Sequence, residues 1–363
     1  MIRVLIVDDS AFIRRVLSEQ LSKFEDIEVV GTAVDPYVAR DRIVSLRPDV
    51  ITLDIEMPRM DGLSFLSKLM HHYPMPVVIV SSLTKENSET ALRALELGAV
   101  EVIAKPGSQF SLPDVPHRLI QAIRAAAVAD VGKRREIQPV EPAPAPREVP
   151  ILPATPTSTR ILAIGASTGG TTAIESILRG MPATMPGAVI VQHMPEYFTK
   201  AFAERLNKFC NIEVREARDN DTVLRGLALV APGNHHMVME RSAGKYLVKI
   251  RDGPPVHHQR PSVDVLFQSV ARSAGRNAVG AILTGMGADG AKGLLAMKEC
   301  GAHTVAQDEQ SCVVFGMPKE AIKLGAADEI VPLKDMTQTL LDRLSAGPSG
   351  TDEKPRKHAP ALR

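Results

Sequence analysis

The sequence predicts an α/β protein with two parallel sheets, one in each half of the chain. Two observations support this fold class. Short, continuously apolar runs alternate with amphipathic segments of helical length, and this alternation occurs on both sides of one proline-rich stretch. Strands of this composition are typical of parallel sheets that are buried on both faces by helices. With 363 residues, the chain is long enough for two domains with separate cores.

The first half predicts a five-stranded parallel sheet. Residues 11–23 and 86–97 place apolar side chains at i, i+3 and i+4, so we expect them to be helices that cover the sheet. The predicted strands are Val4–Val7, Ile27–Ala33, Val50–Leu53, Val77–Val80 and Val100–Ala104.

A proline-rich segment separates the two halves. From about Ala125 to Thr159 the apolar periodicity is lost and prolines alternate with other residues, which indicates an extended, semi-rigid linker. The last residues of the chain also lack apolar periodicity, and we expect them to be disordered. The predicted division is a first domain at 1–122, a linker at 123–159, a second domain at 160–346 and a tail at 347–363.

The second half repeats the alternation of strands and helices. Residues 198–209 and 290–300 have helical character, and residues 235–260 alternate like a β-hairpin inserted around Ala243 and Gly244. A doubly wound α/β domain with a hairpin insertion follows. Its predicted strands are Arg160–Ala166, Gly187–His193, Gly226–Pro232, Ala278–Thr284 and His303–Gln307.

The composition excludes several classes of protein. Apolar residues make up 44% of the chain and charged residues 23%, and the net charge of +1 gives no sign of a nucleic-acid partner. The three cysteines do not form a metal-binding pattern or a disulfide framework. No run approaches the ~18 apolar residues that a membrane span needs. We therefore expect a cytoplasmic monomer that neither enters the membrane nor binds nucleic acid.

Charged and hydroxyl side chains follow the predicted strands of the first half. Ligands of open parallel sheets bind at the carboxyl ends of the strands, where this sequence has three carboxylates, a hydroxyl and an amine. Carboxylates gathered at one edge suit Mg²⁺, and a lysine beside them would neutralise a transferring phosphoryl group. Individually, each Asp is also compatible with a helix N-cap. The residues are Asp8, Asp9, Asp54, Ser81 and Lys105.

The motifs VLIVDDS, LDIEMPRMDGL, VIVSS and AKP resemble the receiver domain of bacterial two-component response regulators, which has a flavodoxin-like fold. The resemblance implies that Asp54 accepts a phosphoryl group from a cognate histidine kinase. Ser81, with Ser82 as its neighbouring alternative, would be the switch hydroxyl together with Lys105. The family's usual aromatic partner of that hydroxyl falls at Val102. Mg²⁺ would be bound by the side chains of Asp9 and Asp54, the backbone carbonyl of Glu56 and, through water, Asp8.

The second half begins with ILAIGASTGGTT, which is compatible with three kinds of glycine-rich site. A Walker A loop requires lysine where this chain has Thr171, and a dinucleotide-binding turn requires glycine where it has Ser167. The third pattern, G-x-S-x-G, is matched in full between a strand and a helix. This pattern predicts a nucleophilic serine on a sharp turn, although a glycine-rich helix cap would produce the same five residues.

A serine nucleophile needs a base and a carboxylate that orients it. His193 follows one predicted strand, and Asp289 follows another within TGMGADG, so both are expected at the same sheet edge as Ser167. The chain order Ser, His, Asp differs from that of the α/β-hydrolases. The glycine-rich loop at 285–290 would present backbone N–H groups to an oxyanion.

The motifs GASTGG, VQHMPEYFTKAFAERL, APGNHHM, QRPSVDVLF, LTGMGADGAKGL and AQDEQSCVVFGMP closely resemble the catalytic domain of the chemotaxis methylesterase family, CheB. The resemblance implies that Ser167 is the nucleophile, His193 the base and Asp289 the orienting carboxylate, with the Met286 backbone N–H in the oxyanion hole. The family hydrolyses glutamate γ-methyl esters, and deamidates certain glutamines, on chemoreceptor helices without a cofactor. A phosphorylation-gated hydrolase is therefore predicted. The alternative is a catalytically idle, receiver-controlled binding module in signalling.

Overall fold

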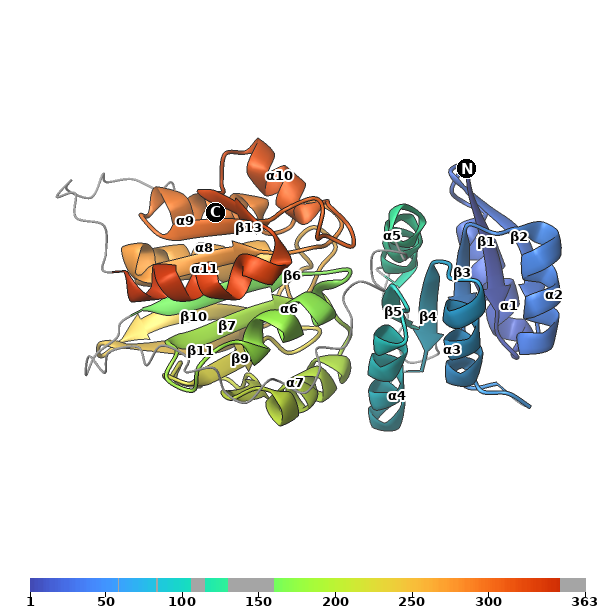
Figure 1. The fold of residues 1–363 in the computed structure, drawn as a ribbon, viewed down its shortest axis with the longest axis horizontal. Helices are drawn as coiled ribbons and strands as arrows, with labels where there is room; N and C mark the ends of the chain where they lie inside the picture. The colour runs from blue at the N-terminus through green and yellow to red at the C-terminus, as the bar shows by residue number, and fades with distance from the viewer. Residues whose placement is uncertain (58, 83, 106–114, 130–159, 347–363) are drawn as a thin grey trace.

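The computed structural model describes residues 1–57, 59–82, 84–105, 115–129 and 160–346. The expected α/β architecture with two parallel sheets is confirmed. In Figure 1 the two domains lie side by side, each with helices on both faces of its sheet. The predicted tail at 347–363 and the part of the predicted linker at 130–159 lie outside the described residues.

The first domain has five parallel strands in the order β2-β1-β3-β4-β5. Side chains near the strand ends start several helices: the Ser10 hydroxyl accepts from the N–H of Ile13, and the Asp35 carboxylate accepts from the N–H groups of Tyr37 and Val38. The elements are β1 Ile2–Val7, α1 Ala11–Leu21, β2 Ile27–Ala33, α2 Pro36–Leu46, β3 Val50–Leu53, α3 Gly62–His72, β4 Val77–Ser81, α4 Lys85–Glu96, β5 Glu101–Ala104 and α5 Val115–Val128.

The helix α5 continues past the expected start of the linker at residue 123. Leu119, Ile120, Ile123 and Ala126 pack into the core under the sheet, so burial of their apolar side chains extends the helix into this part of the sequence.

The second domain has seven parallel strands in the order β14-β13-β12-β6-β7-β9-β8 and a separate hairpin of β10 and β11. The elements are β6 Ile161–Ala166, α6 Gly170–Arg179, β7 Gly187–Gln192, α7 Phe198–Phe209, β8 Glu213–Glu216, β9 Leu227–Val230, β10 His236–Ser242, β11 Lys245–Arg251, α8 Val263–Ala274, β12 Ala278–Ile282, α9 Ala291–Glu299, β13 His303–Gln307, α10 Met317–Lys323, β14 Glu329–Val331 and α11 Leu333–Ser345.

The inserted hairpin forms where its sequence predicts it. Ser242 pairs with Lys245 across a two-residue turn, and both turn residues, Ala243 and Gly244, have positive φ angles of 47° and 79°. Two positive φ angles are the mark of the tight turns whose twist matches that of paired strands. Met237 and Met239 of β10 pack in one core with residues of helix α8, which anchors the hairpin to the domain.

The strands β8 and β14 are absent from the predicted set. Both lie at the edges of the second sheet, and their sequences, EVRE and EIV, are short and partly polar. Partial exposure at the sheet edge permits polar residues in these two strands, so they lack the continuous apolar run that marked the central strands.

The two domains meet through helices α4 and α5 and strand β5 of the first domain, which face the second domain in Figure 1. Helix α4 packs against α7, and Arg205 forms ion pairs with Glu96 across the interface and with Glu175 of its own domain. The rings of His117 and His258 stack across the interface with their centroids 5.1 Å apart. The motif VQHMPEYFTKAFAERL, which contains Arg205, therefore contacts the first domain.

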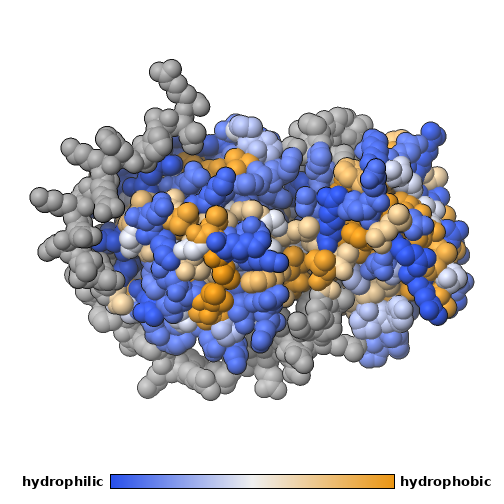
Figure 2. Space-filling model, turned by 90° about the horizontal axis from the view of Figure 1, so that it is seen from above, coloured by the Kyte–Doolittle hydropathy of each residue, from blue (hydrophilic) through white to orange (hydrophobic). Residues whose placement is uncertain are grey.

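The surface is consistent with this two-domain arrangement. In the view of Figure 2, hydrophilic residues cover much of the described surface and apolar residues form separate patches. Among the described helices, none combines the length and the apolar composition required to cross a bilayer.

Candidate functional site

The carboxyl edge of the first sheet gathers the charged residues that its sequence predicts. Lys105 follows β5, and its Nζ lies 2.7 Å from Oδ2 of Asp54 and 3.0 Å from Oδ2 of Asp8. Both aspartates are only 1% exposed, whereas Asp9 is exposed. Oxygens of the three aspartates lie within 4.8 Å of one another. Three carboxylates at this spacing fit a hard divalent cation such as Mg²⁺.

The Asp54 carboxyl is strongly affected by its surroundings. Burial raises its pKa, the hydrogen bond and positive charge of Lys105 lower it, and the charge of Asp8 raises it again, with a result of about 6. The backbone N–H of Glu56 also donates to Asp54 Oδ1 at 3.2 Å. Two buried carboxylates that share one lysine therefore carry excess negative charge when both are ionised, and a second cation would offset it.

The two candidate switch hydroxyls have different environments. Ser81 is completely buried at the end of β4, and its Oγ has no hydrogen-bond partner in the described part of the chain. The Ser82 hydroxyl instead donates to Glu56 Oε2 at 3.2 Å. A buried, unsatisfied hydroxyl at this edge is able to donate to a new anionic group nearby. Val102 lies on the neighbouring strand β5 and is buried in the core.

Ser167 lies on a tight turn between β6 and α6. Its N–H donates to the carbonyl of Thr284, and its own carbonyl accepts from the Gly170 N–H at 2.7 Å. Gly169 has a φ of 79°, and a Cβ added there would lie 2.6 Å from Val313. The turn therefore needs glycine for two separate reasons, its left-handed backbone and the close approach of Val313.

His193 reaches the same place from the adjacent strand. It directly follows β7, which pairs with β6, and its N–H donates to the carbonyl of Ala166. The His193 Nε2 lies 2.7 Å from Oδ2 of Asp289, and both side chains are 2% exposed. The other ring nitrogen, Nδ1, is buried and has no hydrogen-bond partner among the described residues.

Asp289 is held in place by the N-terminus of helix α8. Its carboxylate accepts from the Ser262 hydroxyl at 2.7 Å, the Val263 N–H at 2.8 Å and the Asp264 N–H at 3.0 Å, in addition to His193. Burial opposes ionisation, but the hydrogen bond and charge of His193, with the donors from α8, hold the pKa of Asp289 below its usual range. A helix N-terminus stabilises negative charge in this way.

A pocket of about 250 Å³ opens beside these residues. Met286 and the loop after it form one side, and the His257–Gln259 segment forms another. The first domain contributes the remainder, because Glu101, Arg118 and Gln121 also line the pocket. Sequence patterns did not identify these three residues as part of the site, since no motif connects positions in different domains. Thr168 was also missed, because it occupies a position that the G-x-S-x-G pattern leaves open.

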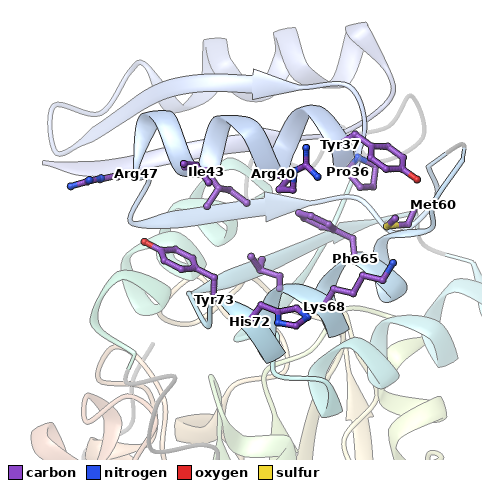
Figure 3. Close-up of a pocket in the computed structure, with 12 residues that line it drawn as sticks. Pro36, Tyr37, Arg40, Ile43, Arg47, Met60, Phe65, Lys68, His72 and Tyr73 are labelled. Atoms are coloured by element: carbon purple, nitrogen blue, oxygen red, sulfur yellow. The ribbon is translucent and has the colours of Figure 1, made fainter.

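Another hollow, of about 650 Å³, lies between α2 and α3 of the first domain and is shown in Figure 3. Its lining is mainly apolar, with Phe65, Tyr37 and Tyr73 near several basic side chains. No carboxylate or serine lines it. The predicted site residues therefore lie outside this hollow, at the carboxyl edges of the two sheets.

Comparison with known proteins identifies both domains. The CheB methylesterase model matches residues 162–340, and the response regulator receiver domain model matches residues 4–115. A protein-glutamate methylesterase/protein-glutamine glutaminase of Syntrophus aciditrophicus is 57% identical over 94% of this chain and 98% of its own length. A relative of the same name from Salmonella typhimurium is 53% identical over 95% of this chain and 98% of its own length.

A solved structure resembles the second domain. The Thermotoga maritima CheB methylesterase catalytic domain is 36% identical, with a TM-score of 0.50, and the match covers 50% of this chain and 97% of that structure. The likeness in sequence extends over both domains, and the likeness in structure covers the domain that contains Ser167.

Proposed function

The chain belongs to the CheB family of protein-glutamate methylesterases/protein-glutamine glutaminases, and we propose that Ser167, His193 and Asp289 carry out its reaction. The protein is a receiver-regulated hydrolase of chemotaxis. The main support for assigning these three residues is the buried His193–Asp289 pair directly beside the serine turn.

The proposed reaction begins with attack of the Ser167 Oγ on the γ-carbonyl carbon of a methylated glutamate side chain. His193 accepts the serine proton and then donates it to the departing methoxide, so methanol leaves and an acyl-serine remains. Water attacks this acyl group with His193 again acting as the base, which releases glutamate and restores the serine. A glutamine side chain follows the same path and releases ammonia.

The hydrogen bonds of His193 favour one ring nitrogen as the base. The N–H at Nε2 donates a hydrogen bond to Asp289. This leaves the lone pair of Nδ1, which is buried and has no partner among the described residues, available for the serine proton. Asp289 then stabilises the imidazolium that forms. The backbone N–H of Met286, which lines the pocket together with Ser167, is proposed to hold the developing oxyanion.

The first domain is proposed to accept a phosphoryl group on Asp54 from a histidine kinase. Mg²⁺ would be bound by Asp8, Asp9, Asp54 and the carbonyl of Glu56, and when bound it neutralises charge on the phosphoryl oxygens. Lys105 supplies a second positive charge, and the Ser81 hydroxyl is free to donate to the phosphoryl group. The modification adds a charge of about −1.5 to −2.

We propose that this charge loosens the interface and opens the pocket. The first domain supplies one wall of the pocket beside Ser167, and in this arrangement it would block a bulky receptor helix. A free-energy shift of about 1–3 kcal/mol between closed and open arrangements changes access about 5- to 150-fold. The proposed substrate is the cytoplasmic part of chemoreceptors, and the proposed location is the cytoplasm, as a monomer.

Two variants test the residue assignments. Ser167→Ala is expected to abolish methanol release from methylated receptors while the protein stays folded, and continued release would exclude Ser167 as the nucleophile. Asp54→Ala is expected to keep the basal rate but lose stimulation by a phosphodonor, and an unchanged stimulation would refute the gating model.

A serine-directed phosphonate distinguishes a hydrolase from the alternative, a catalytically idle binding module. Only an activated Ser167 is expected to be labelled by the phosphonate.

A further inference from the structure

A glutamate of the first domain enters the pocket of an enzyme whose product is a glutamate side chain. Glu101, at the start of β5, lines the pocket together with Ser167 and Met286. Its Oε2 accepts a hydrogen bond of 2.5 Å from Oγ1 of Thr168, the residue directly after the nucleophile. The two residues are 67 positions apart in the chain, so only the docking of the domains creates this contact.

The surroundings of the Glu101 carboxyl group suit a glutamyl side chain. Burial raises its pKa, while the hydroxyl of Thr168 and the positive charges of Arg118 and His193 lower it. Glu101 lines the same pocket as Ser167, and its hydrogen-bond partner Thr168 belongs to the serine turn. Of these neighbours, Thr168 and His193 belong to the second domain and remain at the site when the first domain moves away.

We propose that Thr168 Oγ1 marks a subsite for the γ-carboxyl group of a glutamyl side chain, and that Glu101 fills this subsite as an intramolecular analogue of the product. The inference rests on the proposed function of Ser167. In the open enzyme, Thr168 donates to an oxygen of the substrate ester or product acid. In the closed enzyme, the same hydroxyl donates to Glu101. The first domain therefore competes with the substrate for this hydrogen bond, in addition to blocking access to the pocket.

This proposal differs in its consequences from simple steric blocking. If Glu101 occupies a carboxyl subsite, its removal leaves that subsite free for a small dicarboxylate such as glutarate, which has the length of a glutamyl side chain. If Glu101 only helps to hold the domains together, its removal loosens the interface without creating a binding site for glutarate.

The interface provides a matched control. Glu96 also belongs to the first domain and also pairs across the interface, with Arg205, but it does not line the pocket. Its side chain is 46% exposed, so Glu96→Ala is expected to raise the basal rate less than about fivefold. Glu101→Ala is expected to raise it on the order of tenfold, within the usual range for coupling between sites.

The deciding experiment measures methanol release by the full unphosphorylated chain, with increasing glutarate, for wild type, Glu101→Ala and Glu96→Ala. Glutarate is expected to inhibit Glu101→Ala by raising KM without lowering kcat, and to affect the other two proteins much less. Equal sensitivity of Glu101→Ala and Glu96→Ala to glutarate would overturn the subsite. Ser167-dependent methanol release by wild type tests the proposed function separately, whatever glutarate does.

A second pair of variants tests Thr168 itself in the Glu101→Ala background. Thr168→Val keeps the shape of the side chain but removes the donor, and it is expected to weaken glutarate inhibition about tenfold, as for loss of a hydrogen bond to a charged group. Thr168→Ser keeps the donor and is expected to retain the inhibition. Identical inhibition of the valine and serine variants would show that the hydroxyl does not bind the carboxyl group.

Discussion

Replacing Asp289 with asparagine tests the reasoning about the catalytic pair most directly. The substitution keeps the size of the side chain but removes the charge that faces His193. With Nε2 and Oδ2 2.7 Å apart, the centres of charge of an imidazolium and this carboxylate are roughly 4 Å apart, which corresponds to about 4 kcal/mol at an effective dielectric constant of about 20. That interaction exists only when His193 is protonated, so its loss lowers kcat about a thousandfold.

The asparagine amide adds a second effect on the tautomer of His193. Its NH₂ group is able to donate to Nε2, which moves the ring proton to Nδ1 and removes the proposed base. We therefore expect a loss of about 10³ to 10⁴ in kcat, comparable to that of Asp-to-Asn changes in other Ser-His-Asp triads. Methanol release under saturating receptor measures it.

Ser262→Ala is the matched control, because Ser262 donates to the other carboxylate oxygen of Asp289 and does not contact His193. This hydrogen bond is present in both the ground state and the transition state, so kcat is expected to fall less than about tenfold. Thermal melts check that both variants fold. If Asp289→Asn retained more than about one tenth of the wild-type kcat, the charge on Asp289 would not support His193 as we argue.

Four further outcomes are expected. Because the pKa of Asp289 is lowered in the fold, its ionisation stabilises the protein above the unfolded pKa of about 3.9, so the loss of Tm in Asp289→Asn should be largest near neutral pH and shrink in acid; an equal loss at all pH values would contradict this. Lys105→Met leaves two buried carboxylates without their cation, which should cost about 3–5 kcal/mol in thermal unfolding and be partly restored by Mg²⁺, whereas no response to Mg²⁺ would argue against the metal site. Gly169→Ala should destabilise the protein by about 1–3 kcal/mol and lower kcat, because the added Cβ would clash with Val313. Gly244→Ala, at a position with the same φ of 79° but nothing within 4 Å, should leave kcat unchanged. Similar kcat values for the two variants would show that the close packing around the serine turn does not matter for the reaction. Burial at the interface raises the pKa of Glu101, so the closed state is most stable below the undocked pKa of about 4.3 and becomes less stable as the pH rises through the raised pKa. The basal rate of wild type relative to Glu101→Gln should therefore increase with pH. A constant ratio would contradict the titration of Glu101.

Local sequence was sufficient for most of the architecture. Ten of the strands appear where the sequence predicts them. Eight of these are central strands, which are buried on both faces, and a continuous apolar run reflects that burial. The hairpin turn at Ala243 and Gly244 was also predictable, since the alternation on both sides changes phase there. The edge strands β8 and β14 were missed because their partial exposure permits polar residues.

The candidate residues were predicted from their positions after strands, but the contacts among them were not. The sheet order, with β6 between β12 and β7, brings the loops of Ser167, His193 and Asp289 to one edge. Strand order depends on how crossovers pack, and no local pattern contains that information. The same limit applies to Ser262, whose hydroxyl reaches Asp289 only because α8 points its N-terminus at the carboxylate.

The sequence alone determined the fold class, the nucleophile pattern at Ser167 and the acidic edge around Asp54, because each depends on a short run of neighbouring residues. Only the tertiary structure decided that Nδ1 of His193 has no hydrogen-bond partner in the described part of the chain, and that Glu101 contacts Thr168. The first depends on the direction of a buried ring and the second on the docking of two domains. Both depend on how segments that are far apart in the chain pack against one another, and no single segment contains that information.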